Sequence, residues 1–259
     1  MSVATDHPGG VRLVLDGRLA TVRLDRPEVR NAQTFATWSS LAMIAEQLPA
    51  AVDAVVLCGS GTDFSAGLDL RMMRPQGFGD EGSLPALLAG NDHEIAQRIG
   101  VFQRAFSAWR ELDAVVVAAV QGRAIGAGFQ LALAADLRVA TDTASFVMAE
   151  IGLGLVPDLG GTVRLLELVG YARALDVGLG RPVPAVEALT LGLVTEIVPA
   201  DELDQAVVRR VDAILQHRPD AVRALKRLLA GGITRSYDEQ LAAERAAQAP
   251  LLRGIARPR

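Results

Sequence analysis

Two short segments decide how this chain is organised: Phe64-Ser-Ala-Gly-Leu-Asp-Leu70 and Ala124-Ile-Gly-Ala-Gly-Phe-Gln130. Each follows an apolar run typical of a strand and leads toward a run typical of a helix. Glycines permit tight turns and close approach to a ligand, and the free N–H groups at a helix start point at whatever lies there. The segments therefore predict two halves of one site that stabilises negative charge on a carbonyl oxygen.

Composition indicates a globular protein. Of the 259 residues, 50% are hydrophobic and 22% are charged, which is ample for a sizeable core. We expect one main body with a C-terminal appendage, divided into residues 1–200 and 201–259. The net charge of −4 argues against nucleic acid as the main partner, because phosphate binding needs concentrated Lys and Arg.

The sequence predicts a cytoplasmic protein with no membrane partner. The N-terminal residues lack a basic stretch followed by an apolar one, so they do not resemble a signal peptide. The longest apolar run, Ala114 to Val120, is far shorter than the ~20 residues that span a bilayer. The one cysteine, Cys58, excludes an intrachain disulfide and ends an apolar run, so we expect a buried small hydrophobe.

Alternation and turn signals predict the regular elements. Asp16-Gly17 between two apolar runs predicts a hairpin, and Asn31 or Thr34 can cap the helix that follows. Further strands and helices are expected at residues 52–58, 93–109, 115–120, 129–135, 137–140, 145–148 and 162–169, with an almost wholly helical tail from Asp201. Residues 72–90, rich in Gly and Pro, predict a mobile surface loop, either a lid or a connection without function.

Several site classes are excluded by spacing. A dinucleotide-binding site is not expected, because the glycines that follow a strand, Gly122, Gly126 and Gly128, do not have the G-x-G-x-x-G spacing. A phosphate-binding P-loop is not expected either, because no G-K-[ST] occurs. The three histidines are scattered, so we expect no metal site, and no Gly-x-Ser-x-Gly elbow is present for a hydrolase triad.

Two carboxylates remain as chemical candidates. Glu150 lies between an apolar strand and Ile151-Gly-Leu-Gly-Leu155, where burial would raise its pKa and suit it to act as a general base. Asp158 follows eight residues later. Taken from the residues alone, Glu150 could equally be an exposed strand end and Asp158 a helix N-cap.

Five ordered motifs resemble one family. They are Arg26-Pro-Glu-Val-Arg-Asn-Ala32, Phe64-Ser-Ala-Gly-Leu-Asp-Leu70, Gln121-Gly-Arg-Ala-Ile-Gly-Ala-Gly128, Ala135-Asp-Leu-Arg138 and Gly160-Gly-Thr162. Their order resembles the crotonase superfamily, the enoyl-CoA hydratase/isomerase family, over residues 10–230. The resemblance implies an α/β spiral of repeated ββα units with a helical C-terminal region that forms a homotrimer or a dimer of trimers.

The resemblance also implies an acyl-CoA thioester as substrate and no separate cofactor. Position by position, it places the oxyanion-stabilising amides at Leu68 and Ala127. It assigns the coenzyme A groove to the following residues: Val29, Ser65, Ala66, Gly67 and Asp69.

Departures from the family pattern favour one reaction. Hydratases of the family use two glutamates twenty positions apart, and here the first position is Gln130 and the second is Glu150. Gln130 can hold a water but cannot take its proton. Enoyl-CoA isomerases need only the second glutamate. Dienoyl-CoA isomerases also place an aspartate at the position of Asp158, but carry an acid where Gln130 stands.

We therefore predict an enoyl-CoA isomerase with Glu150 as base, Asp158 as second acid or polar orienter, and Gln130 as a positioning group. Two alternatives stay open: a 2-enoyl-CoA hydratase that tolerates Gln130, and a catalytically silent acyl-CoA-binding protein. Many members end in a helix whose basic residues meet the coenzyme A phosphates. This sequence ends at Arg257-Pro-Arg259, so those contacts are not expected to follow the family pattern.

Overall fold

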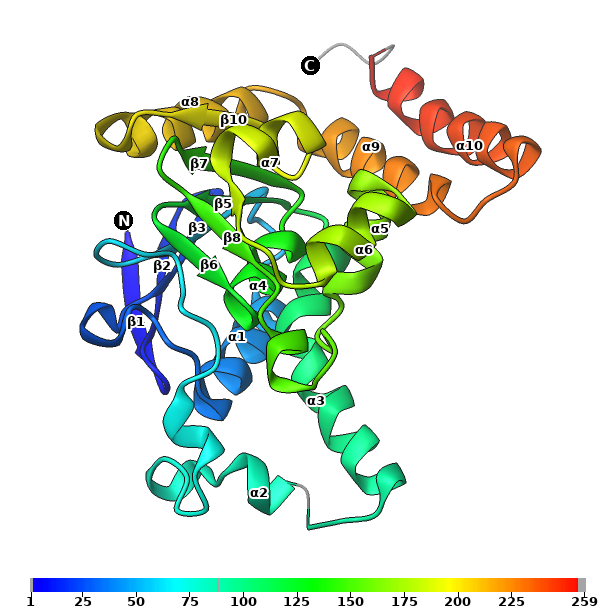
Figure 1. The fold of residues 1–259 in the computed structure, drawn as a ribbon. Coiled ribbons are helices and arrows are strands. Elements are labelled where there is room, and N and C mark those ends of the chain that lie inside the picture. The colour runs from blue at the N-terminus through cyan, green and yellow to red at the C-terminus, as the bar shows by residue number, and fades with distance from the viewer. Residues whose placement is uncertain (1, 88, 256–259) are drawn as a thin grey trace.

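The computed structural model describes residues 2–87 and 89–255, so the expectation for residues 257–259 lies outside the described part. A seven-stranded sheet organises the body, in the spatial order β1-β2-β3-β4-β5-β7-β10 (Figure 1). Its strands are β1 (Val3–His7), β2 (Val11–Asp16), β3 (Leu19–Leu24), β4 (Ala54–Gly59), β5 (Val115–Val120), β7 (Leu137–Thr141) and β10 (Glu196–Val198). The pairs from β3 to β10 are parallel, and β1-β2-β3 is an antiparallel meander.

A second, three-stranded sheet lies beside the first. It contains β6 (Arg123–Ile125), β8 (Ser145–Val147) and β9 (Val183–Pro184), in the order β6-β8-β9. β6 pairs with β8 in parallel, and β8 pairs with β9 antiparallel. This sheet carries the start of the second glycine segment, so it positions one half of the expected site.

Helices follow most of the strands. The longer ones are α1 (Phe35–Gln47), α3 (Asp92–Glu111), α4 (Ala127–Ala134), α5 (Gly161–Val169), α6 (Tyr171–Gly178), α7 (Ala185–Leu191), α8 (Leu203–Leu215), α9 (Pro219–Gly232) and α10 (Tyr237–Ile255). Shorter turns are α2 (Leu84–Leu87), η1 (Pro27–Val29), η2 (Leu70–Met73), η3 (Gly79–Glu81), η4 (Glu150–Leu153) and η5 (Ala200–Glu202).

Both faces of the parallel strands are covered. α1, α3 and α4 bury the larger core, in which Trp38 packs between Phe102 and Phe106. α8 covers the opposite face through a second apolar cluster. Burial on both faces explains why β4 is an uninterrupted apolar run with every residue buried, rather than an alternating one.

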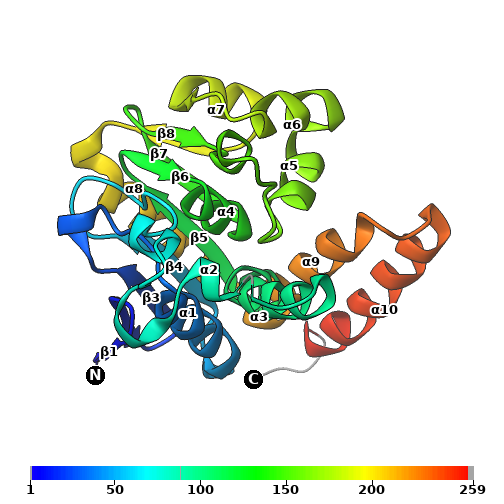
Figure 2. The ribbon, with the colours of Figure 1, turned by 60° about the horizontal axis from the view of Figure 1, so that its bottom comes forward.

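The last two helices reach beyond the body. Figures 1 and 2 show α9 and α10 as an antiparallel pair that projects from the sheet. α9 is attached by ion pairs, of Arg223 to Asp53 and of Lys226 to Asp136, both with 2.7 Å between the charged atoms. Because α8 still packs on the sheet, the projecting arm begins at Pro219. The division after residue 200 stays a prediction.

Most expected elements are present. The hairpin across Asp16-Gly17 is confirmed, and Thr34 is the N-cap of α1, where its hydroxyl accepts from the Thr37 amide. Cys58 is buried, and desolvation raises the pKa of its thiol to about 11. β1 was not expected, because its residues are largely exposed and polar and only its antiparallel pairing with β2 orders it.

The segment of residues 72–90 is less loop-like than expected. It contains η3 and α2, the side chain of Met72 is fully buried, and Glu81 accepts a hydrogen bond of 2.9 Å from the Ala36 amide at the start of α1. Whether this segment acts as a lid stays a prediction. No helix in the described ranges is long and apolar enough to cross a membrane.

Candidate functional site

The two glycine segments lie against each other. Ser65 and Ala124 form a parallel bridge, with hydrogen bonds of 3.0 Å from the Ser65 amide to the Arg123 carbonyl and from the Ile125 amide to the Ser65 carbonyl. Gly67 has a φ of +84°, and a Cβ there would collide with the Ile125 carbonyl and lie 3.5 Å from the Ala127 nitrogen. Only glycine permits this approach, which brings the first segment up to the Ala127 amide.

The direction of the Leu68 N–H is fixed by a hydrogen bond to the carbonyl of the same peptide, that of Gly67. The Gly67 carbonyl accepts a 2.7 Å hydrogen bond from the Gln33 amide. In a planar trans peptide the C=O and N–H point in opposite directions, so the Leu68 N–H points away from Gln33. No hydrogen-bond partner for it occurs among the described residues. Leu68 therefore offers a free donor.

The Ala127 amide has the same character. Ala127 is the first residue of α4, after the N-cap Gly126 at φ +52°. The Gly126 carbonyl accepts from the Gln130 amide at 2.9 Å, so the Ala127 N–H points out of the helix start. Within residues 2–87 and 89–255 it too has no partner. Two free backbone donors thus come from adjoining segments.

The far end of α4 is held by two arginines, one buried and one partly buried. Arg138, only 1% exposed, donates to the Ala135 carbonyl at 2.6 Å and also to that of Leu193. Arg164 donates to the Leu133 carbonyl at 3.1 Å. These arginines satisfy carbonyls that the end of a helix leaves open, and they complement its negative pole. The sequence motif containing Arg138 indicated the family but not this role.

Glu150 and Gln130 form the centre of the site. The side-chain oxygen of Gln130, Oε1, accepts hydrogen bonds from the backbone amides of Leu159 and Gly161 at 3.0 and 3.1 Å. The side-chain nitrogen, Nε2, donates to Glu150 Oε1 at 2.7 Å. Because two backbone N–H groups donate to one end of the Gln130 side-chain amide, that end must be the oxygen, and the NH₂ end faces the Glu150 carboxylate. Glu150 Oε2 is buried, with no partner in the described part of the chain.

Burial raises the pKa of Glu150, and the nearby charge of Asp158 adds to this, although hydrogen bonds from its own amide and from Gln130 partly oppose it. Gly126 is also close, because a Cβ on it would lie 3.3 Å from Glu150 Oε1. The carboxylate is therefore adjacent to the start of α4, where the free Ala127 amide lies.

Asp158 lies near enough to Glu150 to act on its charge. Burial raises the pKa of its carboxyl as well, and its charge acts on Glu150. Its backbone is held by Gln103 on α3, whose Nε2 donates to the Asp158 carbonyl at 2.6 Å. A pair of neighbouring acids with raised pKa values suits proton transfer near neutral pH.

The residues expected to line the coenzyme A groove surround the first segment. Val29, Ala66 and Leu68 are partly exposed, whereas Ser65 and Asp69 are buried. Ser65 Oγ donates to the Asn31 carbonyl and accepts from the Gly67 amide, so its polar groups have protein partners. Asp69 pairs with Arg26 and Arg71. Direct contact of these residues with a ligand stays a prediction.

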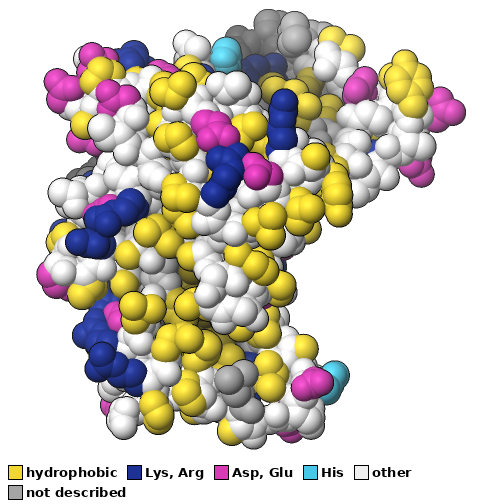
Figure 3. Space-filling model, viewed as in Figure 1, with side chains coloured by type: hydrophobic (Ala, Val, Ile, Leu, Met, Phe, Trp, Pro, Cys, Tyr) yellow, Lys and Arg dark blue, Asp and Glu magenta, His cyan; other side chains and the backbone are white. Residues whose placement is uncertain are grey.

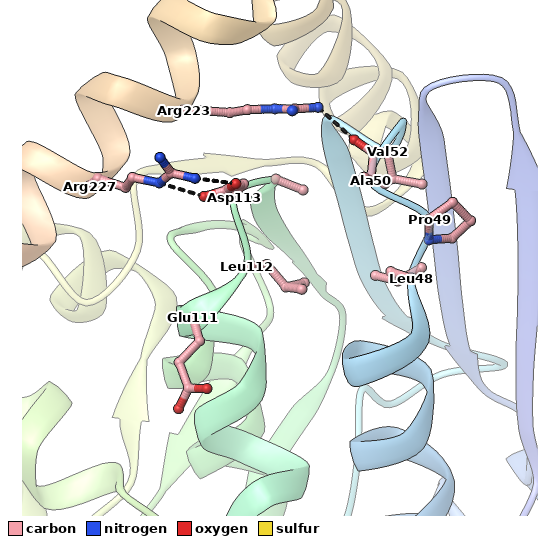
Figure 4. Close-up of a pocket in the computed structure, with 10 residues that line it drawn as sticks. Leu48, Pro49, Ala50, Val52, Glu111, Leu112, Asp113, Arg223 and Arg227 are labelled. Carbon is pink, nitrogen blue, oxygen red and sulfur yellow. Dashed lines mark hydrogen bonds and ion pairs between the residues drawn. The ribbon is translucent and has the colours of Figure 1, made fainter. Parts of the chain in front are cut away.

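A separate pocket of about 500 Å³ lies at the base of the α9–α10 arm (Figure 4). Its lining includes Leu48, Leu112 and two arginines, and none of the site residues above takes part. Arg227 is paired with Asp113, and Arg223 donates to the Ala50 carbonyl, as the dashed lines in Figure 4 show. Both arginines of this pocket are therefore engaged within the protein.

Known proteins resemble this chain in sequence. A family model described as enoyl-CoA hydratase/isomerase matches residues 16–253. The chain is 33% identical over 236 residues to "Probable enoyl-CoA hydratase echA8" of Mycobacterium bovis, covering 89% of this chain and 84% of that protein. It is 32% identical over 238 residues to the short-chain-enoyl-CoA hydratase of Clostridium acetobutylicum, covering 90% and 86%.

Solved structures give the same result. A structure from Thermobifida fusca YX in complex with acetoacetyl-CoA superimposes with a TM-score of 0.91 at 42% identity, covering 95% of this chain and 96% of that one. The α/β crotonase fold with C-terminal helices is therefore confirmed. The chain belongs to the enoyl-CoA hydratase/isomerase family, the crotonase family, and is an acyl-CoA enzyme of that family.

Proposed function

We propose that this enzyme shifts a double bond within an enoyl-CoA, with Glu150 as the proton-transferring base. One observation carries the proposal: Gln130 binds Oε1 of Glu150, and Oε2 is buried with no partner among residues 2–87 and 89–255. A buried, unpartnered carboxylate oxygen with a raised pKa is suited to take a proton from carbon near neutral pH.

The proton balance of the reaction needs no added reactant. Glu150 Oε2 takes a proton from C2 of a 3-enoyl-CoA, and the electron pair moves onto the thioester oxygen as an enolate. The N–H groups of Leu68 and Ala127 stabilise that oxyanion. A proton returned at C4 gives the conjugated 2-enoyl-CoA. We assign to Asp158 the delivery of the second proton or the orientation of the substrate, and the raised pKa of its carboxyl supports this role.

Hydration of a 2-enoyl-CoA is the second candidate, because relatives of this chain are named enoyl-CoA hydratases. Its physical obstacle is Gln130. The side-chain amide cannot take a proton from water, its oxygen is occupied by two backbone amides, and its nitrogen already donates to Glu150. One acid would have to activate and place the water alone.

The test is to incubate the protein with a 3-enoyl-CoA and to follow the conjugated 2-enoyl thioester by absorbance, beside Glu150→Gln. We expect conjugation with the wild-type protein and its loss in the variant. A wild-type protein that instead adds water to 2-enoyl-CoA would establish the hydratase. Binding of acyl-CoA without turnover of either substrate would contradict both reactions and favour the silent binding protein.

We also propose that the chain forms a homotrimer or a dimer of trimers. Exposed apolar side chains support this: Figure 3 shows hydrophobic groups over α5 and α6, and more occur on α9. The exposed set includes Val163, Leu166, Tyr171, Leu175, Leu179, Leu225, Leu229 and Ile233. An apolar surface of this extent marks an interaction site. Sedimentation or light scattering measures the state, and a monomer would contradict the proposal.

A further inference from the structure

The residue that anchors the first oxyanion donor is not itself part of either glycine segment. Gln33 precedes α1, is fully buried, and forms a parallel bridge with Leu68. Its amide donates to the Gly67 carbonyl at 2.7 Å, and its carbonyl accepts from the Asp69 amide at 2.8 Å. Gln33 therefore holds the chain on both sides of Leu68.

The Gln33 side chain makes a second, independent attachment to the same segment. Its Nε2 donates to Ser65 Oγ at 3.0 Å, and Ser65 Oγ in turn accepts from the Gly67 amide at 3.2 Å. Its Oε1 accepts from Trp38 Nε1 at 2.8 Å. Trp38 is packed among aromatic rings of α1 and α3, so this end of the side chain is fixed to the core.

These contacts have a direct consequence for the Leu68 N–H. Rotation of the Gly67–Leu68 peptide would break the bond from Gln33 to the Gly67 carbonyl, and rotation of the preceding peptide would break the bond to Ser65. A hydrogen bond to a peptide carbonyl also polarises the N–H on the opposite side of the same peptide. Both effects favour a donor that is aligned before substrate arrives.

We propose that Gln33 is a positioning residue for the oxyanion site: through Ser65 and the Gly67 carbonyl it aligns the Leu68 amide that stabilises the thioester enolate. This inference rests on the oxyanion role proposed for Leu68. A glutamine fits the position because it supplies one donor and one acceptor to two fixed partners, which no apolar side chain can do.

The test combines kinetics with a spectroscopic probe. Butanoyl-CoA carrying an isotope label at its thioester carbonyl is bound to the wild-type protein and to Gln33→Met, and the carbonyl stretch is recorded by infrared difference spectroscopy. We expect binding to the wild-type protein to lower the stretching frequency, and Gln33→Met to lose part of that shift. For isomerisation of a 3-enoyl-CoA, the kcat of Gln33→Met should fall roughly 10- to 100-fold with little change in KM, as misalignment of an oxyanion donor predicts.

Two further variants separate alignment from a general loss of stability. Ser65→Ala removes the partner of the Gln33 side chain, so its effect and that of Gln33→Met should be non-additive in the double variant. Ser40→Ala removes another hydrogen bond on α1, from its hydroxyl to the Pro8 carbonyl, and should leave the carbonyl shift unchanged.

A Gln33→Met variant that binds butanoyl-CoA with the full wild-type shift and keeps its kcat would overturn the role of Gln33 and leave the oxyanion site standing. Absence of any shift in the wild-type protein would overturn the oxyanion site itself, and the role of Gln33 with it.

Discussion

Glu150 and Asp69 are both shielded carboxylates near the glycine segments, yet their surroundings are opposite. Asp69 accepts hydrogen bonds from Arg71 and Arg26. These bonds lower the pKa of its carboxyl to about 2, and the bond from Arg71 has the largest effect. The donors to Glu150 are neutral, the Gln130 side chain and its own amide, and burial raises its pKa. A carboxylate satisfied by arginines stabilises the fold, whereas one left with a free oxygen is available for proton transfer.

Of the variants that test this comparison, Glu150→Gln should have the largest effect. The amide keeps the size of the side chain but removes the base, so kcat for isomerisation should fall by about 10³-fold, within the range for general base catalysis. Initial rates with 3-enoyl-CoA measure it. Glu46→Gln, on the exposed face of α1, is the matched control and should retain the wild-type rate. An active Glu150→Gln enzyme would remove Glu150 from the mechanism.

Gln130→Glu should convert the neutral partner of Glu150 into a second acid. Because the partner atoms are 2.7 Å apart, the two carboxyl groups would share a proton, which leaves one neutral acid and one carboxylate to place and activate a water beside the pair. We expect 2-enoyl-CoA hydration to rise by about 10²-fold, which chromatographic detection of the 3-hydroxy product measures. Gln130→Met, which cannot exchange a proton, should show no such gain. Equal hydration by all three proteins would contradict this account of Gln130.

Asp69→Asn tests the other side of the comparison. Loss of the charge leaves Arg26 and Arg71 without their carboxylate, and the free energy of unfolding should decrease by about 2 kcal/mol. Urea denaturation measures it. Asp6→Asn, which breaks an exposed pair with Arg12, is the control and should cause no measurable change. If both variants were equally stable, Asp69 would have no special structural role.

The smallest effect should be a pH dependence of opposite sign at the two carboxylates. The folded pKa of Asp69 is lowered, so its stabilisation is present above its ordinary value of 3.8 and is lost as pH falls from 3.8 toward 2. The folded pKa of Glu150 is raised, so its ionised form reduces stability at neutral pH, and this penalty disappears as pH falls below 4.5.

Thermal unfolding of the wild-type protein and Glu150→Gln across this range distinguishes the two effects. The variant should be more stable at neutral pH, and the difference should vanish near pH 4.5. In the same window the isomerisation rate should rise with pH, because only the deprotonated Glu150 acts as a base. A difference that grows on acidification would contradict the raised pKa.

Much of the fold could be predicted from local pattern. The hairpin, the buried strand β4, the cap at Thr34 and the glycine segments all have short-range signatures, because alternation, capping and turn residues act within a few positions. β1 could not be predicted, since its exposed polar residues become a strand only through pairing with β2. The short helices of residues 72–90 likewise depend on contacts such as Glu81 with α1.

The family, the positions of Glu150 and Gln130, and the two segments that supply the backbone donors could all be identified from residue order. The orientation of these groups depends on how distant segments pack. Gln130 turns its NH₂ toward Glu150 because two amides from residues 159 and 161 occupy its oxygen, and Gln33 faces Gly67 across a gap of more than thirty residues in sequence. The physical reason is that a hydrogen bond depends on direction as well as on residue type, and direction is fixed by packing between segments that are distant in the chain.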